Sequence, residues 1–174
     1  LISHFAKKGL VDIARKALVA QTTPKKAAKA LKRILHEKDF ALLAMELGVK
    51  VIHVSERDTK TTDKPREVDE FVGTWSIEGL REEGTAPAEL GWGTHEKRPP
   101  IFFSRPPYGP KNQIFFSRMG MNTWVRSWVP YSEVIGMTIR HGESFSISDK
   151  LTVWKNGKAA YRPTVHYAYM PCDD

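Results

Sequence analysis

The first 48 residues carry apolar side chains at the spacing of amphipathic helices. Apolar positions recur three and four residues apart between Leu10 and Leu18, which predicts a first helix. A polar break follows, in which we expect Thr23 to be the N-cap and Pro24 the first residue of a second helix that ends near His36. The chain is therefore predicted to begin with two helices that each have one apolar face.

A third, shorter helix and a strand follow. Asp39 is a suitable N-cap for this helix, and Gly48 can end it in a left-handed backbone conformation. Residues 49–55 alternate and are rich in β-branched side chains, which predicts a strand. Residues 57–70 are polar and charged, and we interpret them as a linker or an exposed loop. A helix, a glycine and then a strand is the order of an α/β unit.

From Phe71 onward the pattern changes to short β-like runs separated by turn residues. The dipeptide Asn156-Gly157 is the strongest hairpin signal, because a type I′ turn needs positive φ at both residues. The run Ile-Phe-Phe-Ser-Arg occurs at 101–105 and again at 114–118, which predicts paired strands across a proline-rich loop. The predicted fold class is α+β, with N-terminal helices followed by a mostly antiparallel sheet. The predicted strands are 71–77, 101–104, 114–118, 123–129, 134–140, 144–148, 151–155 and 159–169.

Composition and charge narrow the class of protein. No apolar run approaches the roughly 20 residues that a transmembrane helix needs, which argues against a membrane-spanning protein. A single cysteine, Cys172, excludes an internal disulfide framework and suits a reducing compartment, so we expect a cytoplasmic protein. The net charge of +7 lies entirely in residues 1–60, which hold 13 Lys+Arg and 6 Asp+Glu.

The basic first part of the chain has two interpretations. Binding to nucleic acid or to a membrane surface would gather the lysines into one functional patch. Between Lys25 and Leu35, however, the lysines alternate with apolar residues at helical spacing, as on the solvated face of an amphipathic helix. We favour the solvated face and predict no nucleic-acid or membrane partner, since the sequence carries no RNA- or DNA-binding motif.

Several catalytic and cofactor motifs are missing from the sequence. It has no glycine-rich dinucleotide turn, P-loop, H-E-x-x-H or G-x-S-x-G motif. His141-Gly142-Glu143 and Pro171-Cys172 resemble parts of the zinc deaminase signature. The residues after His141 are predicted to form strands rather than a helix that presents metal ligands, so we expect no metal site.

One group of polar and aromatic residues predicts a ligand pocket. Trp75 lies in a strand-like run that leads into a loop rich in glycine and in acids, among them Glu83. Glu56 follows the predicted strand 49–55, at the end where ligands bind in α/β sheets. An indole face beside carboxylates holds a cation, and a histidine such as His141 transfers protons near neutral pH. These residue types together predict a pocket for an amine or a polycation.

Each of these residues also has an ordinary structural interpretation. Trp75 lies in an apolar run and suits a core position. Glu83 is consistent with a solvated loop, and Glu56 with an exposed position or a pair to Arg57. His141 is consistent with a surface position between polar neighbours. Residue type and spacing alone leave these alternatives open.

Longer strings of residues resemble a known family. Thr74-Trp75-Ser76 and the run from Pro87 to Glu96 (PAELGWGTHE) closely resemble bacterial homospermidine synthases, of the saccharopine dehydrogenase-like superfamily. In that family a glycine-rich dinucleotide turn would precede Leu1, so the resemblance implies an internal fragment from the middle of the family's length. Further similar blocks are 54–59, 126–128, 141–144 and 161–172.

The resemblance implies an NAD-dependent enzyme that transfers an aminobutyl group between two putrescine molecules, or between putrescine and spermidine. Such an enzyme oxidises the first amine, exchanges the imine with loss of ammonia and reduces the product again. The resemblance also implies a homodimer. Residues 1–60 would be the C-terminal part of a Rossmann-like NAD-binding domain, and residues 61–174 part of the substrate sheet domain. The alternative is a related reductase acting on an amino acid or a carboxylated polyamine, which would need a cation for the substrate carboxylate.

The resemblance places the family's functional residues on four positions. Trp75 matches the active-site tryptophan that lies over the cationic amine or iminium. Glu56 and Glu83 match acids that hold the ammonium groups of the substrate, and Glu83 is also expected to be catalytic. His141 matches the histidine near the nicotinamide and the reacting carbon, as a catalytic and cofactor-binding residue. The implied cofactor is NAD, without a metal.

Overall fold

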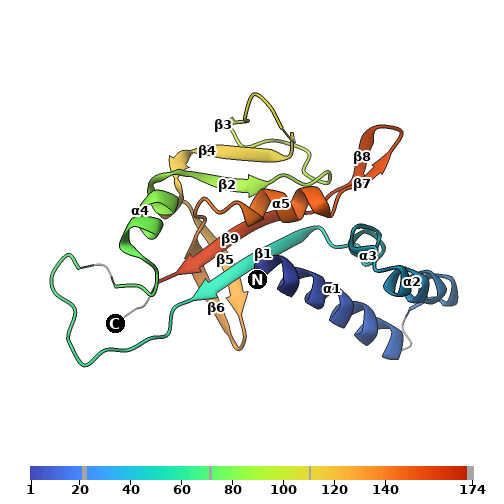
Figure 1. Ribbon diagram of the computed structural model, residues 1–174, viewed down its shortest axis with the longest axis horizontal. Helices are drawn as coiled ribbons and strands as arrows, with labels where there is room; N and C mark the ends of the chain where they lie inside the picture. Colours follow the sequence, from blue (N-terminus) through green and yellow to red (C-terminus); the bar gives the residue numbers. More distant parts are fainter. Residues whose placement is uncertain (21–22, 71, 110, 172–174) are drawn as a thin grey trace.

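The N-terminal part of the chain is a group of three helices. The computed structural model describes residues 1–174 except 21–22, 71, 110 and 172–174. The three helices and the strand predicted before residue 60 are confirmed, and the first helix begins eight residues before the apolar stripe that predicted it. They are α1 (Ile2–Val19), α2 (Lys25–Glu37), α3 (Phe40–Glu46) and β1 (Val51–Arg57) (Figure 1).

Local hydrogen bonds set the ends of these helices, with one correction to the sequence analysis. Asp39 caps α3 as expected, since its side chain accepts a hydrogen bond of 2.9 Å from a backbone amide of the first turn. Gly48 follows the helix with a φ of 67°, the expected left-handed conformation. The expected N-cap at Thr23 is wrong. Its hydroxyl donates to the carbonyl of Ala17 at 3.0 Å, in the last turn of α1, and Pro24 is the N-cap of α2.

The later part of the chain forms a seven-stranded sheet that includes β1. The strands occur in the order β3-β4-β2-β9-β6-β5, and β1 pairs with β9. Among the described strands only the β1–β9 pair is parallel, so the predicted α+β class with a mostly antiparallel sheet is confirmed. The strands are β2 (Pro87–Gly91), β3 (Phe103–Ser104), β4 (Gln113–Met119), β5 (Trp124–Val129), β6 (Ser132–Met137) and β9 (Thr164–Met170).

Two predicted strand pairs are confirmed. The hairpin of β7 (Val153–Lys155) and β8 (Lys158–Tyr161) turns at Asn156 and Gly157, whose φ angles are 51° and 73°. The repeated Phe-Phe-Ser runs also pair, because Phe103 lies opposite Phe116 in the antiparallel β3–β4 pair. Local sequence signals therefore sufficed for these connections.

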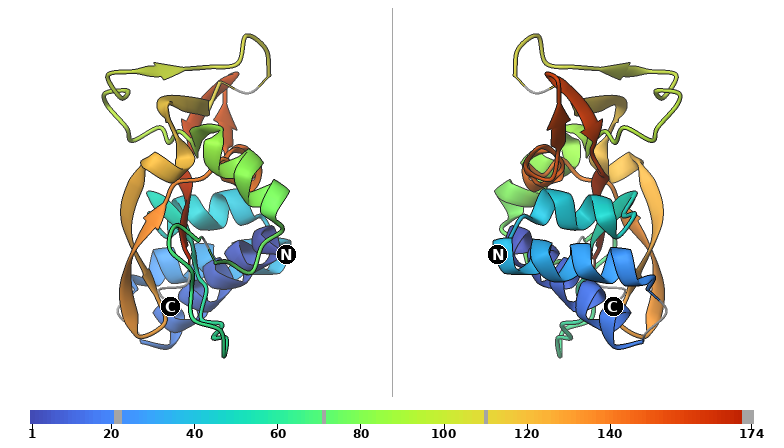
Figure 2. Two further views of the ribbon diagram at one scale, coloured as in Figure 1. Left: turned by 90° about the vertical axis from the view of Figure 1, so that its left-hand side faces the viewer. Right: turned by 90° about the vertical axis from the view of Figure 1, so that its right-hand side faces the viewer.

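Strand β9 lies at the centre of the fold. Residues 164–169 are all buried, and β1 pairs with β9 in parallel over seven residues. Figure 2 shows helix α4 (Ile77–Thr85) and the β5–β6 hairpin on opposite sides of β9. Tyr167 and Tyr169 pack with Leu80 of α4, so these two tyrosines mark the face of the sheet that α4 covers.

Two of the predicted strands are wrong. Residues 72–76 are neither helix nor strand, and residue 71 lies outside the described residues. Ser76 caps α4 instead, since its hydroxyl accepts a hydrogen bond of 3.1 Å from the amide of Gly79. The acids expected in a loop, including Glu83, are therefore on a helix.

The predicted strand 144–148 is part of helix α5 (Glu143–Lys150). Five residues are too few to distinguish the period of a strand from that of a helix. Apolar residues at alternate positions also fit within one and a half helical turns. The decisive positions are Ser144 and Ser148, which are buried four residues apart on one helix face. Polar side chains at buried positions concealed that face from the hydrophobic pattern.

The loop expected around Pro87–Gly91 is also wrong, because these residues form β2 between β4 and β9. All its residues after Pro87 are buried. Proline, glutamate and glycine are depleted in strands, so composition argued against one here. The predicted run 159–169 is divided into β8 and β9 at Arg162 and Pro163.

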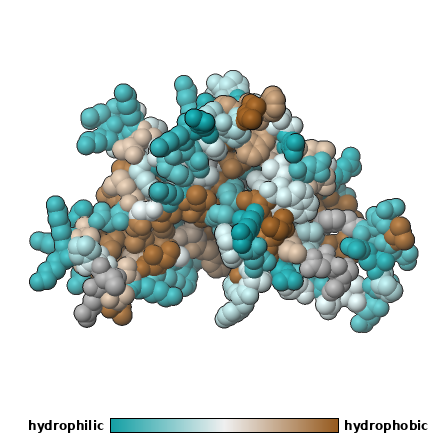
Figure 3. All heavy atoms as spheres, turned by 180° about the vertical axis from the view of Figure 1, so that it is seen from behind, coloured by the Kyte–Doolittle hydropathy of each residue, from teal (hydrophilic) through white to brown (hydrophobic). Residues whose placement is uncertain are grey.

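The apolar residues form two buried clusters. The larger joins α1, α2 and α3 to α5 and the sheet, and the smaller joins α4 to β6 and β9. Apolar side chains also gather in the middle of the face seen from behind (Figure 3). Among the described residues, no helix combines the length and the apolar character needed to cross a bilayer.

Close packing of β2 against α5 predicts that Gly91 tolerates no side chain. A Cβ at this position would lie 2.4 Å from Cβ of Ser148 and 2.5 Å from the carbonyl oxygen of Ser144. We expect Gly91→Ala to lower the free energy of unfolding by about 1–3 kcal/mol, measured by urea denaturation. The matched control is Gly9→Ala in α1, where a Cβ meets open space and helix propensity improves. Unchanged stability in Gly91→Ala would contradict this packing.

Candidate functional site

The four side chains predicted for the site contact one another in a chain from Glu56 through Trp75 and His141 to Glu83. Figure 1 shows β1 and β9, the strands that carry Glu56 and Tyr167, side by side. Two other residues lie among them, Tyr167 of β9 and Glu143 at the start of α5. The predicted residues are Glu56 in β1, Trp75 before α4, Glu83 in α4 and His141 before α5.

The carboxylate of Glu56 is held by two donors. The indole Nε1 of Trp75 donates to Oε1 at 2.9 Å, and the hydroxyl of Tyr167 donates to Oε2 at 3.3 Å. Hydrogen bonds to an ionised acceptor are stronger than neutral ones and fix its orientation. The position of the Glu56 carboxylate is therefore set by two aromatic side chains.

Trp75 belongs both to the core and to the site. Its ring lies 5.1 Å from the ring of Tyr169 and 6.1 Å from the ring of His141, centroid to centroid. It packs against the smaller apolar cluster and is nevertheless only half-buried. The core interpretation of this residue is thus compatible with the functional one, because the core holds the indole in place beside the carboxylates.

His141 lies between two carboxylates and on an aromatic ring. Its Nδ1 lies 2.6 Å from Oε2 of Glu143, and its Nε2 lies 4.0 Å from Oε2 of Glu83. Its ring stacks on Tyr167 with centroids 4.3 Å apart and planes 16° apart. The short contact places Nδ1 against Glu143 without the alignment of a hydrogen bond, and Nε2 is the ring nitrogen on the side of Glu83. The surface interpretation is excluded, since the side chain is only 17% exposed.

Glu83 is the carboxylate with the least support from its neighbours. Burial raises its pKa; His141 opposes this effect, while the other carboxylates, including Glu143 and Glu56, add to it. Its Oε2 atom is buried and accepts no hydrogen bond from the residues that the structure describes. A buried carboxylate oxygen without a donor is an energetic penalty that a bound ammonium group would remove.

Tyr167 acts as a donor throughout the neutral pH range. Burial raises the pKa of its phenol, and the negative charge of Glu56 raises it further. The protonated hydroxyl donates to Glu56 while the ring supports His141. Tyr167 was not predicted as a site residue. It lies in an aromatic and β-branched run, which indicates a buried strand but not a ligand site.

Glu143 was also missed as part of the pocket, although its position two residues after His141 offered a signal. Strands were predicted after His141, with no helix to present metal ligands. That prediction is wrong, because helix α5 begins at Glu143. Cys172, the other half of the deaminase-like pattern, lies outside the described residues. Within the described ranges, no three His, Cys, Asp or Glu side chains are close enough to hold a metal ion.

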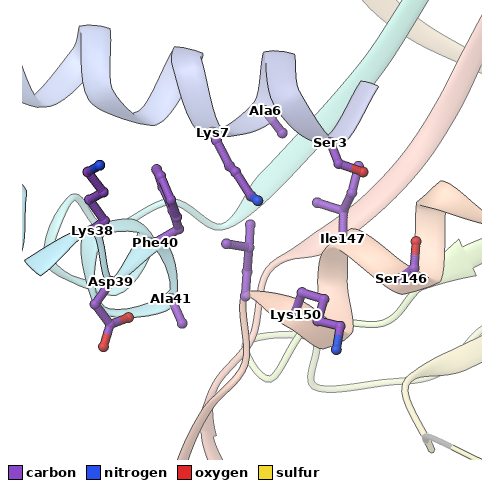
Figure 4. Close-up of a pocket in the computed structure, with 11 residues that line it drawn as sticks. Ser3, Ala6, Lys7, Lys38, Asp39, Phe40, Ala41, Ser146, Ile147 and Lys150 are labelled. Carbon is purple, nitrogen blue, oxygen red and sulfur yellow. The ribbon is translucent and has the colours of Figure 1, made fainter. Parts of the chain in front are cut away.

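Two cavities are each lined by part of the site. One, of about 670 Å³, runs along α1 and β1 and ends at Glu56 and Tyr167. The other, of about 420 Å³, is lined by Trp75, by residues of α4 and by Met137. A third cavity of about 580 Å³ lies between α1, α3 and α5, and none of the predicted site residues lines it (Figure 4).

The arrangement combines charge, an aromatic face and a titratable ring. Three carboxylates, Glu56, Glu83 and Glu143, lie within contact of Trp75, Tyr167 or His141. Carboxylates attract ammonium groups, and an indole face attracts a cation or a carbon chain that bears one. Imidazole side chains commonly act as general acids or bases in enzymes.

The chain is similar to proteins of known activity. The family model described as Saccharopine dehydrogenase C-terminal domain matches residues 1–174. Two curated homospermidine synthases, from Mesorhizobium japonicum and Blastochloris viridis, are 42% and 43% identical to the chain over 176 residues. A crystal structure of homospermidine synthase from Legionella pneumophila in complex with NAD superposes with a TM-score of 0.81 at 43% sequence identity.

These similarities extend along all of this chain but only part of the other proteins. The alignments cover 100% of the chain and 35% of each curated relative. The structural superposition covers 99% of the chain and 36% of the Legionella protein. The chain therefore spans about a third of the length of the relatives it matches.

The raised pKa of Glu83 predicts how its replacement changes stability. A carboxyl whose pKa is raised by folding stabilises the fold at low pH, and this contribution is lost as pH rises through the raised pKa. We therefore expect Glu83→Gln to have a higher melting temperature than the wild type at pH 7. The difference should shrink as pH falls through the raised pKa of Glu83 and be smallest below the ordinary glutamate pKa of about 4.3.

The control for this prediction is Glu82→Gln, an exposed neighbour on the same helix, which should show no such pH-dependent difference. Melting temperatures would be measured by circular dichroism from pH 4 to pH 8. A lower melting temperature for Glu83→Gln at pH 7 would mean that the ionised carboxylate stabilises the fold.

Proposed function

Because the chain belongs to the family of saccharopine dehydrogenase C-terminal domains, we propose that it forms the amine-binding part of an NAD-dependent homospermidine synthase. The reaction transfers an aminobutyl group from one putrescine to a second putrescine or to spermidine. The observation that supports this proposal most directly is the set of three carboxylates around Trp75 and His141.

The two ammonium groups of a diamine match two carboxylates of this site. Glu56 is oriented by Trp75 and Tyr167 and would bind one ammonium group. Glu83 has a buried oxygen that lacks a donor among the described residues, and binding an ammonium group would satisfy it. The indole of Trp75 would lie against the carbon chain or the iminium carbon between them. A diamine is therefore a better fit than a monoamine.

His141 is suited to move the protons that this chemistry requires. Amine exchange needs a proton for the leaving ammonia and removes one from the attacking amine. Nδ1 lies against Glu143, whereas Nε2 is on the side of Glu83, the carboxylate that we propose binds the substrate ammonium group. Stacking on Tyr167 limits ring rotation, which keeps Nε2 directed at the site.

NAD, when bound, would take up and return a hydride. The chain fits only the nicotinamide end of this cofactor, through His141, since the glycine-rich phosphate turn is not among its residues. The ring of His141 is partly exposed and rigidly supported, as contact with a planar ring requires. The identity of the surrounding residues with homospermidine synthases supports its role as a cofactor-binding residue.

A related reductase acting on an amino acid or a carboxylated polyamine is the second candidate. Such a substrate carries a carboxylate, which a cluster of three glutamates would repel. We therefore favour putrescine and spermidine as substrates. We further propose a cytoplasmic homodimer without nucleic-acid or membrane partners, and residues 1–60 as the part next to the nucleotide.

The polypeptide that the gene encodes should make homospermidine and ammonia from putrescine in the presence of NAD. Mass spectrometry would detect both products. We expect Trp75→Leu and Glu83→Gln each to lower kcat/KM about 10- to 30-fold, as for loss of a desolvated cation–π or charge interaction of about 2 kcal/mol. Both variants should remain folded at the assay temperature, so the loss of activity should not follow from a change in melting temperature.

Matched controls are available on the same chain. Trp154→Leu removes a tryptophan that is 59% exposed in the β7–β8 hairpin, and Glu82→Gln removes an exposed acid of α4. Both should keep wild-type turnover. Hydride transfer from an amino acid, without homospermidine, would overturn the proposal in favour of the related reductase.

A further inference from the structure

A second carboxylate, Asp58, lies two residues after Glu56 and is only 8% exposed. It accepts three hydrogen bonds. The hydroxyl of Thr74 donates to Oδ1 at 2.6 Å. The amide of Thr74 donates to Oδ2 at 3.1 Å, and the hydroxyl of Tyr169 donates to Oδ2 at 2.7 Å. Both oxygens of Asp58 are thus engaged by the polypeptide itself.

Asp58 and Glu56 repeat one arrangement along the strand. Glu56 accepts hydrogen bonds from Trp75 and from Tyr167 of β9. Asp58 accepts them from the residue before Trp75 and from Tyr169, two positions further along β9. Positions two apart on a strand face the same side, so the two carboxylates and the two tyrosines form a ladder. The Thr74-Trp75 dipeptide spans the ladder.

The segment around Trp75 has little other support. Residues 72–76 belong to no helix or strand, so no ladder of backbone hydrogen bonds fixes them. Thr74 itself is exposed, and its amide and hydroxyl both bond to Asp58. Asp58 is attached to the sheet, since its amide donates to the carbonyl of Met170 at 2.9 Å. Asp58 therefore ties the residue before Trp75 to the sheet, in addition to the bond that the indole itself makes to Glu56.

We propose that Asp58 is a positioning residue that holds the indole of Trp75 over the amine site by accepting hydrogen bonds, without contributing its charge to substrate binding. The inference rests on the proposed function, because it deepens the role given there to Trp75. It assigns a function to a residue that follows β1 and that the sequence alone places in a polar linker.

The charge state of Asp58 agrees with this role. Burial opposes its ionisation, but hydrogen bonds from Thr74 and Tyr169 outweigh that effect and lower its pKa. The carboxylate therefore remains an acceptor over the whole range in which the enzyme would work. Its three donors leave it less available to an ammonium group than Glu83, whose Oε2 receives no bond from the described residues.

Asparagine is the informative replacement. Its carbonyl oxygen would accept from the amide of Thr74 and from Tyr169, and its NH₂ would donate to the Thr74 hydroxyl, which also serves as an acceptor. Asp58→Asn thus keeps the ladder and removes the charge. Asp58→Ala removes both, and Thr74→Val removes the hydroxyl bond alone.

The experiment uses the encoded polypeptide with NAD and putrescine. We expect Asp58→Ala to lower kcat/KM about tenfold, Thr74→Val to lower it less, and Asp58→Asn to stay within about threefold of wild type. Combining Asp58→Ala with Trp75→Leu should cost little more than Trp75→Leu alone, since both act on one indole. Asp63→Ala, in the same exposed segment, is the control with wild-type activity.

Three results would overturn the inference. If Asp58→Asn were as inactive as Asp58→Ala at an equal melting temperature, the charge of Asp58 would act on the substrate. Additive effects of Asp58→Ala and Trp75→Leu would mean that Asp58 acts elsewhere. Activity of Asp58→Ala that falls only in proportion to the folded fraction would indicate a general structural role.

A second measurement keeps the inference testable when the activity assay fails. In protein labelled with 5-fluorotryptophan, the ¹⁹F resonance of Trp75 is identified by its loss in Trp75→Phe. This resonance should move in Asp58→Ala and Thr74→Val and remain in place in Asp58→Asn. An unmoved resonance in Asp58→Ala overturns the positioning role. Wild-type protein that makes no homospermidine would instead count against the proposed function.

Discussion

The parallel pairing of β1 with β9 is the interaction on which the candidate site depends. The two strands pair in register over seven residues, although more than 100 positions separate them in the sequence. This register places Glu56 and Asp58 beside Tyr167 and Tyr169. The other face of β1 is fixed by His53, whose Nδ1 lies 2.9 Å from the hydroxyl oxygen of Ser127 in the β5–β6 hairpin. A slip by one residue would turn both carboxylates away from their tyrosine donors.

The carboxylates of this region differ in how far the polypeptide satisfies them. Asp58 accepts three hydrogen bonds and Glu56 accepts two, whereas Oε2 of Glu83 is buried without a donor among the described residues. A buried anion without partners is destabilising, and natural folds rarely retain one without a function. This difference supports the roles proposed above, with Asp58 as a positioning residue and Glu56 and Glu83 as the carboxylates that bind the amine.

Sequence patterns predicted the helices and strands whose residues have the matching periodicity or turn preference. They failed for elements that bury polar residues, proline or glycine. The N-terminal helices and the Asn156-Gly157 hairpin follow from periodicity and turn chemistry. Strand β2 was missed because it contains proline, glutamate and glycine, and only its neighbours β4 and β9 make it a strand. Helix α5 was missed because its buried positions include serines. In both cases tertiary packing outweighs local propensity.

The same distinction applies to the site. Two signals in the sequence predicted the site residues Glu56, Trp75, Glu83 and His141. Their charged, indole and imidazole groups occur near glycines and predicted strand ends, and the surrounding residues resemble a known family. Tyr167 and Asp58 could not be predicted in this way. A tyrosine in an apolar strand and an aspartate in a polar segment are common and indicate no ligand site. Their importance comes from partners at sequence separations of 111 residues. Residues that contact a ligand can therefore carry a chemical signature, whereas residues that position them acquire their role only from the fold.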